Sequence, residues 1–134
     1  MIRGPLKVYD STPALVAALF AEREGFFREL CDAVFPRFFE HRLEIDQSSA
    51  VAALIDELGY SGAAYLDFAA GQGAQLFERC QQEAADDHVF GVPLFVLCGE
   101  QFWGQDRLPL LEERLTQAGL LRETQEERAD DHQR

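Results

Sequence analysis

Hydrophobic residues recur at helical spacing along the first two thirds of the chain. Between Thr12 and His88 they form five amphipathic stretches separated by glycines, serines or short polar loops, and this spacing is typical of helices. The connections are short and no internal repeat is visible. The pattern therefore predicts a compact helical bundle over residues 12–88.

Start and stop signals bound each of these helices. In the first, Ser11-Thr12-Pro13 combines hydroxyl caps with a first-turn proline, and Leu15, Ala18 and Leu19 then share one face up to about Arg23. Gly25 is expected to end this helix. Ser48 or Ser49 should cap the third helix, which Gly59 ends, and Ser61 should cap a fourth that runs to Ala70. Gly71 and Gly73 separate it from the fifth, which ends at Asp86-Asp87-His88.

The second helix carries two adjacent apolar rows. Their members, four residues apart, are Phe26, Leu30, Val34 and Phe38 in one row and Phe27, Cys31, Phe35 and Phe39 in the other. A stripe of that width is too broad for a surface helix, so we expect this segment to pack between other helices, with Pro36 weakening its last turn.

The pattern changes at Phe90 to one typical of a hairpin followed by a helix. Leu94–Cys98 is an apolar, β-prone run, Gly99-Glu100 is the expected tight turn, and Gln101–Trp103 is a short return strand. Gln105-Asp106 then opens a last helix that ends at Gly119. Its expected inward-facing residues are Leu108, Leu111, Leu115 and Ala118.

The 134 residues fit one domain. We predict a single domain over residues 1–121, in which 12–88 form the helical bundle and 90–118 a ββα unit. Residues 122–134 are polar and are expected to form a frayed tail.

A two-stranded hairpin is only marginally stable alone, and Leu94–Leu97 is apolar on both faces, as in a strand with neighbours on each side. Leu6–Tyr9 is the only other candidate strand, and it is short. We therefore expect the remaining strands to be absent from this chain or supplied by another one.

Composition narrows the functional classes. Apolar residues make up 47% of the chain, and 24 acidic against 12 basic residues give a net charge of −12, which disfavours nucleic acids and anionic membranes as partners. No apolar run approaches the ~20 residues of a membrane span, and Met1–Pro5 lacks the apolar stretch of a secretion signal, so we expect a cytoplasmic protein. Cys31, Cys80 and Cys98 are expected to be reduced and mostly buried.

Two motifs carry a family resemblance. Phe90-Gly91-Val92-Pro93-Leu94-Phe95-Val96, together with Gly99-Glu100-Gln101-Phe102-Trp103-Gly104-Gln105-Asp106-Arg107-Leu108, resembles the C-terminal half of 2-hydroxychromene-2-carboxylate isomerases and kappa-class glutathione transferases. The likeness extends over roughly Pro13 to Leu115. It implies a DsbA-like thioredoxin fold interrupted by a helical insert.

The fold class expected here is accordingly mostly α with a small β-hairpin. It comprises the helical insert and the C-terminal ββα half of a thioredoxin-like fold, without the N-terminal βαβ unit. In the resembling enzymes that unit carries the serine or the cysteine pair that acts on the glutathione sulfur, so no catalytic residue is assigned in this chain.

The resemblance also implies a glutathione site. Pro93 would follow a cis peptide bond, leaving the N–H and C=O of Val92 to pair with the cysteinyl part of glutathione. Gln105 and Asp106, at the start of the last helix, would hold the γ-glutamyl group, which carries both charges. The alternatives are that Pro93 only opens a strand and that Asp106 only caps its own helix.

The other candidate residues are interpreted as structural and not as functional. Phe102 and Trp103 could line an apolar substrate pocket, but core packing is the preferred interpretation. Cys98 is expected within a strand and is a poor nucleophile candidate. No metal site is expected, because His41, His88 and His132 lack ligand spacing.

These observations support a truncated isomerase-like protein that retains part of a glutathione cradle, takes glutathione or a small aromatic substrate, and has weak or no isomerase activity alone. The alternative is a non-catalytic assembly module that completes its sheet in a homodimer or with a partner chain. A third interpretation is that the chain is part of a longer enzyme whose preceding segment supplies the first strand and its loop.

Overall fold

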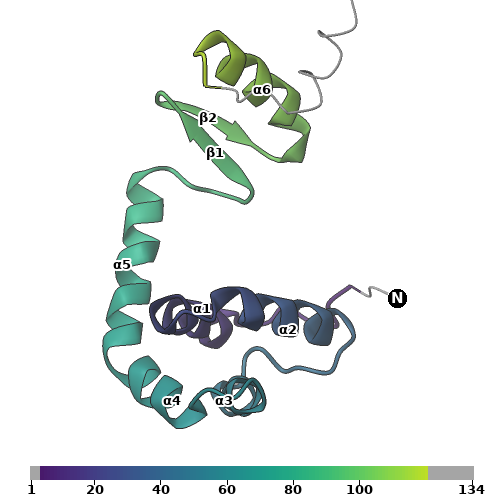
Figure 1. Cartoon of the computed structure of the whole chain (residues 1–134), viewed down its shortest axis with the longest axis vertical. Coiled ribbons are helices and arrows are strands. Elements are labelled where there is room, and N and C mark those ends of the chain that lie inside the picture. The colour runs from purple at the N-terminus through teal and green to yellow at the C-terminus, as the bar shows by residue number, and fades with distance from the viewer. Residues whose placement is uncertain (1–3, 121–134) are drawn as a thin grey trace, which may run out of the picture. The chain divides into compact units, whose positions relative to one another are not determined.

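The computed structural model describes residues 4–120 and divides them into two compact units, one up to Glu83 and one from Ala84 onward. The elements, drawn in Figure 1, are α1 (Thr12–Glu24), α2 (Phe27–Phe39), α3 (Ser48–Glu57), α4 (Gly62–Ala70), α5 (Gln72–Asp86), β1 (Leu94–Leu97), β2 (Glu100–Trp103), the 3-10 helix η1 (Gln105–Arg107) and α6 (Leu108–Gln117). The expectation of a mostly helical chain with one hairpin is confirmed. The predicted tail over 122–134 lies outside the described residues.

The core of the first unit lies between α1, α2, α3 and α4. Tyr65 of α4 is fully buried at its centre, and its hydroxyl donates a hydrogen bond to the carbonyl oxygen of Pro13 at 3.0 Å. Phe20 packs against the rings of Phe26 and Phe68 with centroid distances of 5.9 and 5.6 Å. Interlocked aromatic rings of this kind fix the angles at which the helices meet.

The first helix departs from its expected cap and face. Neither hydroxyl at its start caps it; instead the Asp10 carboxylate accepts the Thr12 N–H at 3.0 Å. Hydrogen bonds from the side chain and the backbone of Thr12 lower the pKa of Asp10. The buried side chains of α1 are Val16, Ala17, Phe20 and Ala21, whereas the predicted face contains the exposed Leu15.

The second helix does not pack between other helices on both sides. Its inner face buries Leu30 and Ala33, while Phe27 and Phe35 of the other apolar row are about half exposed. Cys31, Phe35 and Phe39 of that row instead border an open apolar groove of about 220 Å³ between α1 and α2, which includes Leu15. The width of the apolar stripe therefore reflects a groove as well as a core.

Two small residues act differently from each other in the following helices. Ser61 caps α4 as predicted, because its hydroxyl accepts the Ala64 N–H at 3.1 Å. Gly73 does not separate two helices but lies inside α5, where a Cβ atom would come within 2.6 Å of the Phe68 ring. Close packing against Phe68 therefore explains why a glycine occupies this helical position.

The hairpin of the second unit turns one residue earlier than predicted. β1 pairs antiparallel with β2, with Leu94 opposite Trp103 and Leu97 opposite Glu100. The turn residues are Cys98 and Gly99, both with positive φ (52° and 83°), as two-residue hairpin turns favour. Cys98 therefore lies in an exposed turn, and the expectation that it sits buried within a strand is wrong.

The second unit has a thin core. α6 contacts both strands and lies along one side of the hairpin (Figure 1). Arg114 of α6 donates to the Glu100 carboxylate at 3.1 Å, so Glu100 and Phe102, two residues apart in β2, face α6. Phe102 is the only buried hydrophobic residue among the described residues of this unit. No residue of α6 is buried, and Leu108, expected to face inward, is about half exposed.

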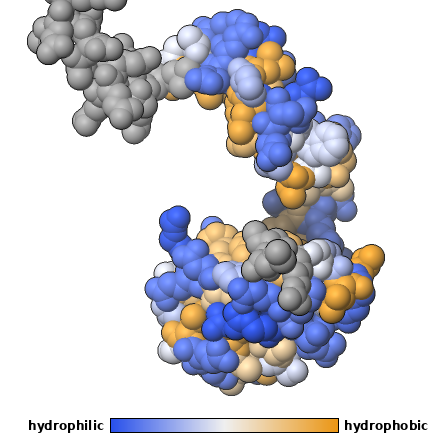
Figure 2. Space-filling model, turned by 90° about the vertical axis from the view of Figure 1, so that its right-hand side faces the viewer, coloured by the Kyte–Doolittle hydropathy of each residue, from blue (hydrophilic) through white to orange (hydrophobic). Residues whose placement is uncertain are grey.

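The opposite face of the hairpin is apolar and open. Strand alternation places Leu94, Val96 and Trp103 there, and Val96 and Trp103 are more than half exposed. Hydrophobic side chains reach the surface of both units in Figure 2. Among the described residues β1 and β2 are the only strands, and Leu6–Tyr9 is not one.

No helix within residues 4–120 combines the length and the apolar character needed to cross a membrane.

Candidate functional site

The loop before β1 presents backbone at the surface. The Val92–Pro93 peptide bond is cis, as the resemblance implies, and Val92 is 85% exposed. Among the described residues, no hydrogen bond engages the backbone of Val92. Its N–H and C=O are therefore accessible to an extended ligand.

A hydrogen bond joins this loop to the segment after β2. The Gly104 N–H donates to the Pro93 carbonyl oxygen at 2.9 Å, so Val92 and Gln105, thirteen positions apart in the sequence, flank one contact. Gly104 has φ 93°, a conformation that glycine adopts readily. The structure thus brings the predicted site residues to one place in the second unit.

Gln105 and Asp106 do not start the last α-helix directly. They form η1, with α6 following from Leu108. Neither η1 nor α6 has a side-chain cap, so the structure does not show Asp106 capping its own helix. The Asp106 carboxylate is 77% exposed and lies 3.8 Å from Arg107. It can accept hydrogen bonds from a cationic group at the surface.

Trp103 borders this site and is not a core residue. Its ring packs on Phe90 with a centroid distance of 5.0 Å, and the indole nitrogen lies 2.5 Å from where a Cβ of residue 91 would be, so a side chain at position 91 would force the indole to shift. Phe102 by contrast is buried against α6. The preference for core packing is therefore confirmed for Phe102 and wrong for Trp103.

The chemistry available at this site is binding chemistry. It offers backbone donors and acceptors, one carboxylate, one amide and an aromatic surface. The cysteines are all free, and within the described residues no group of three His, Cys, Asp or Glu side chains could hold a metal ion.

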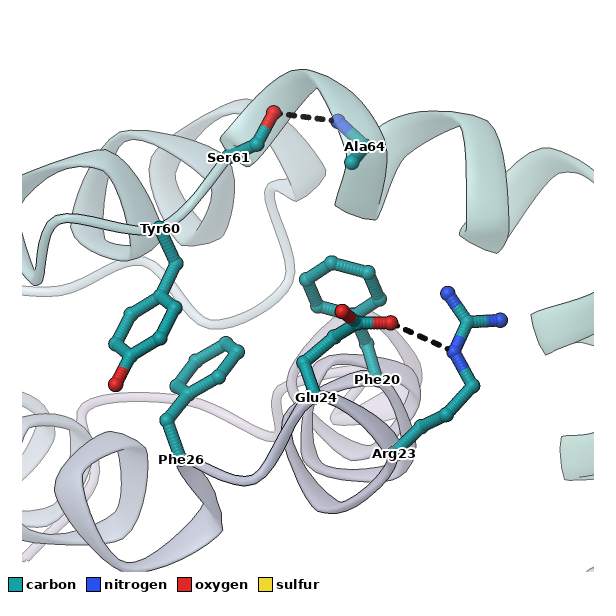
Figure 3. Close-up of a pocket in the computed structure, with 7 residues that line it drawn as sticks. All are labelled: Phe20, Arg23, Glu24, Phe26, Tyr60, Ser61 and Ala64. Atoms are coloured by element: carbon teal, nitrogen blue, oxygen red, sulfur yellow. Dashed lines mark hydrogen bonds and ion pairs between the residues drawn. The ribbon is translucent and has the colours of Figure 1, made fainter.

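A second concave site, which the sequence reasoning did not single out, lies in the helical unit (Figure 3). The end of α1 and the start of α4 border an open cavity of about 360 Å³, lined by Phe20, Arg23, Glu24, Phe26, Tyr60, Ser61 and Ala64. The only signal in the sequence is an aromatic residue directly before a helix cap, Tyr60 before Ser61. That signal is too common to mark a site.

Comparison with known proteins yields one family and one named group of relatives. The family model described as DSBA-like thioredoxin domain matches residues 4–116. Two proteins named 2-hydroxychromene-2-carboxylate isomerase are similar: that of Pseudomonas sp. (strain C18) is 32% identical over 60% of this chain and 39% of its own length, and that of Pseudomonas putida is 27% identical over 78% and 52%.

A solved structure titled as 2-hydroxychromene-2-carboxylate isomerase (HCCA isomerase) superposes with a TM-score of 0.69 and 24% identity, covering 87% of this chain and 58% of that one. It shows the fold. The chain thus spans about 40–60% of the length of these relatives.

Proposed function

This chain belongs to the family of DSBA-like thioredoxin domains, and from that premise we propose that it is an isomerase-like thioredoxin-fold protein that retains part of a glutathione-binding cradle. Val92 holds the cysteinyl part of the tripeptide through its backbone. Gln105 and Asp106 hold the γ-glutamyl end. A small aromatic substrate is the second ligand, because the similar Pseudomonas proteins are named for such a compound.

The observation that carries this proposal is the 2.9 Å hydrogen bond between Gly104 and Pro93. It holds the exposed backbone of Val92 next to η1, so one extended ligand can reach both. A peptide that pairs with a free backbone segment gains affinity from main-chain hydrogen bonds. The carboxylate of Asp106 complements the ammonium of a γ-glutamyl group.

We propose further that this chain alone has little or no isomerase activity. Isomerisation through a glutathione thiolate needs a group that lowers the pKa of the thiol. In the resembling enzymes that group comes from an N-terminal βαβ unit, and the described residues contain no strand before β1. We also place the protein in the cytoplasm, with which its free cysteines agree.

Isothermal titration with reduced glutathione tests the binding. We expect saturable binding to the full chain, weakened about tenfold by Asp106→Asn, since a hydrogen bond to a charged group is worth about 1.5–3 kcal/mol. Asp67→Asn, at an exposed position of α4, is the matched control and should bind like the parent. Absence of binding at millimolar glutathione would remove glutathione from the proposal.

A second candidate function is that of an assembly module. β1 pairs only with β2 among the described residues, and the hairpin face away from α6 exposes Val96 and Trp103. An unpaired, uncharged edge strand invites pairing with another chain. In this reading a second copy or a partner chain supplies the missing strands, and no catalysis is involved.

Multi-angle light scattering distinguishes this candidate. A dimer should form in a concentration-dependent way and be weakened by Val96→Lys, because an edge lysine opposes strand pairing. Ala85→Lys adds the same charge at an exposed position of α5 and should leave the dimer intact. A stable monomer of 15.1 kDa would count against assembly through this edge.

A further inference from the structure

The groove between α1 and α2 is an apolar space that a ligand can reach. The two helices pack against each other (Figure 1), and the side chains that line the groove come from successive turns of both. Leu15 is 46% exposed and Phe35 is 59% exposed. Ala18, Cys31 and Val34 are half-buried. Apolar side-chain surface is therefore open to solvent along the groove.

The groove is long and narrow. On α1 it extends from Ser11 to Ala18, a length of about 10 Å at a rise of ~1.5 Å per residue. The volume of about 220 Å³ spread over that length leaves a cross-section of roughly 20 Å². A helix, at ~10–12 Å across with its side chains, is too wide to enter. A single straight hydrocarbon chain fits, and apolar cavities of even ~150 Å³ bind small hydrocarbons.

The walls of the groove determine what can lie inside it. Among the described residues that line it none is charged, and the polar side-chain groups are the hydroxyl of Ser11 and the thiol of Cys31. A charged group or an amide placed there would lose its hydration without gaining partners. The inserted part of a ligand must therefore be hydrocarbon.

The rim of the groove carries exposed carboxylates. Asp10 directly precedes Ser11, Glu22 follows Ala18 by one helical turn, and Asp32 follows Cys31. The whole chain has a net charge of −12. A field of this sign attracts a cationic head group and repels an anionic one.

Few cations oppose this field near the groove. Arg28 is exposed on α2, one turn before Asp32. Arg37 and Arg42, toward the other end of α2, already pair with Glu57 and Glu40. The charge at the rim therefore complements a cation.

We propose that the groove between α1 and α2 is a binding site for an aliphatic amine, that is, a straight alkyl chain that ends in an ammonium group. The alkyl chain lies along the groove beside Leu15 and Phe35. The ammonium group, which is strongly hydrated, stays in water at the rim near the carboxylates.

This inference does not rest on the proposed glutathione function. Every lining residue belongs to the helical unit, whereas Val92, Gln105 and Asp106 belong to the other unit. Either site can therefore fail its test while the other passes.

Isothermal titration of the full chain compares three probes with the same alkyl chain: octylamine, 1-octanol and octanoate, each below the concentration at which it forms micelles. At low ionic strength octylamine should bind most tightly, at least about threefold more tightly than octanoate, as exposed charge pairs allow. Added salt should narrow that difference. Butylamine has the same head group and four fewer methylenes, so it should bind at least about tenfold more weakly than octylamine.

Paired substitutions separate the charge at the rim from the charge of the whole chain. The double variant Glu22→Gln, Asp32→Asn should narrow the preference for octylamine over octanoate. The double variant Asp67→Asn, Glu78→Gln changes the net charge equally at exposed positions of α4 and α5 outside the groove, and it should retain the preference.

Two observations locate the alkyl chain. Ala18→Leu projects a larger side chain into the groove and should weaken octylamine binding, whereas Ala63→Leu, at an exposed position of α4, should not. Octylamine should also slow the labelling of Cys31 by methyl methanethiosulfonate, a small neutral thiol reagent. Cys98, in its exposed turn outside the groove, is the control within the same chain and should be labelled at an unchanged rate.

Three results on the parent chain would overturn the inference, whatever the variants do to folding. The first is octanoate binding as tightly as octylamine at low ionic strength. The second is the absence of octylamine binding at millimolar concentration, or binding that leaves the labelling of Cys31 unchanged. The third is protection of Cys31 in a dimer without any added amine, which would make a second copy of the chain the occupant of the groove.

Discussion

Removing the Phe102 side chain should unfold the hairpin unit and leave the helical unit folded. Phe102 is 2% exposed and is the only buried hydrophobic residue among the described residues of its unit. Truncation of a buried phenylalanine to alanine costs about 3–5 kcal/mol. At the usual ~0.05–0.15 kcal/mol per residue, a unit of about 37 described residues has a stability on the order of 2–6 kcal/mol. The loss is therefore comparable with the whole stability of the unit.

Residue-resolved amide hydrogen exchange is the suitable assay, because it measures the opening of each element separately. In Phe102→Ala, the amides of β1, β2 and α6 should lose protection, and those of α1, α3 and α4 should keep it. Phe90→Ala, which truncates a phenylalanine that is 69% exposed, should change protection little. Full protection of β1 in Phe102→Ala, or loss of protection in both units together, would refute the assignment of a separate, thin core.

Three further outcomes follow from local geometry. Gly73→Ala should destabilise the chain by about 1–3 kcal/mol in urea unfolding, although alanine normally favours a helix interior, because its Cβ would meet the Phe68 ring. Tyr65→Phe should cost about 1 kcal/mol through the lost hydrogen bond to Pro13. Burial raises the pKa of Tyr65, so the chain should lose stability as the pH rises above about 10. Tyr65→Phe, which has no group to ionise there, should lose less stability over the same pH range. The pKa of Asp10 is lowered in the folded chain, so its ionised carboxylate stabilises α1 above the unfolded pKa of about 4, and this stabilisation is lost as the pH falls. Asp10→Asn should keep the cap, and its melting temperature should depend less on acid pH.

The sequence predicted the elements better than their faces. α1 reads Ala-Leu-Val-Ala-Ala-Leu-Phe-Ala over residues 14–21, so periodicity alone could not select Val16 and Phe20 over Leu15. The cap at Ser61 was predictable because it is the only Ser, Thr, Asp or Asn among the four residues directly before α4. At α1 three capping residues stand in a row, and only the structure shows that Asp10 accepts the hydrogen bond.

The geometry of the hairpin turn and of the two sites could not be predicted from the sequence. The one-residue shift of the hairpin turn requires positive φ at Cys98, which propensity places at glycine or asparagine instead. The motif around Val92 and Gln105 was visible in the sequence, but the hydrogen bond that joins its halves was not. The cavity at Arg23 depends on a tertiary contact between α1 and α4, which no local pattern encodes.

The central claim is that exposed backbone at Val92 and the residues of η1 form one glutathione site. Titration of the isotopically labelled chain with reduced glutathione, followed by amide NMR shifts, tests it most directly. The account predicts that the amides of Val92, Gly104, Gln105 and Asp106 shift together and saturate with one dissociation constant, while those around Arg23 stay in place. Unchanged shifts at these four amides at millimolar glutathione would contradict it.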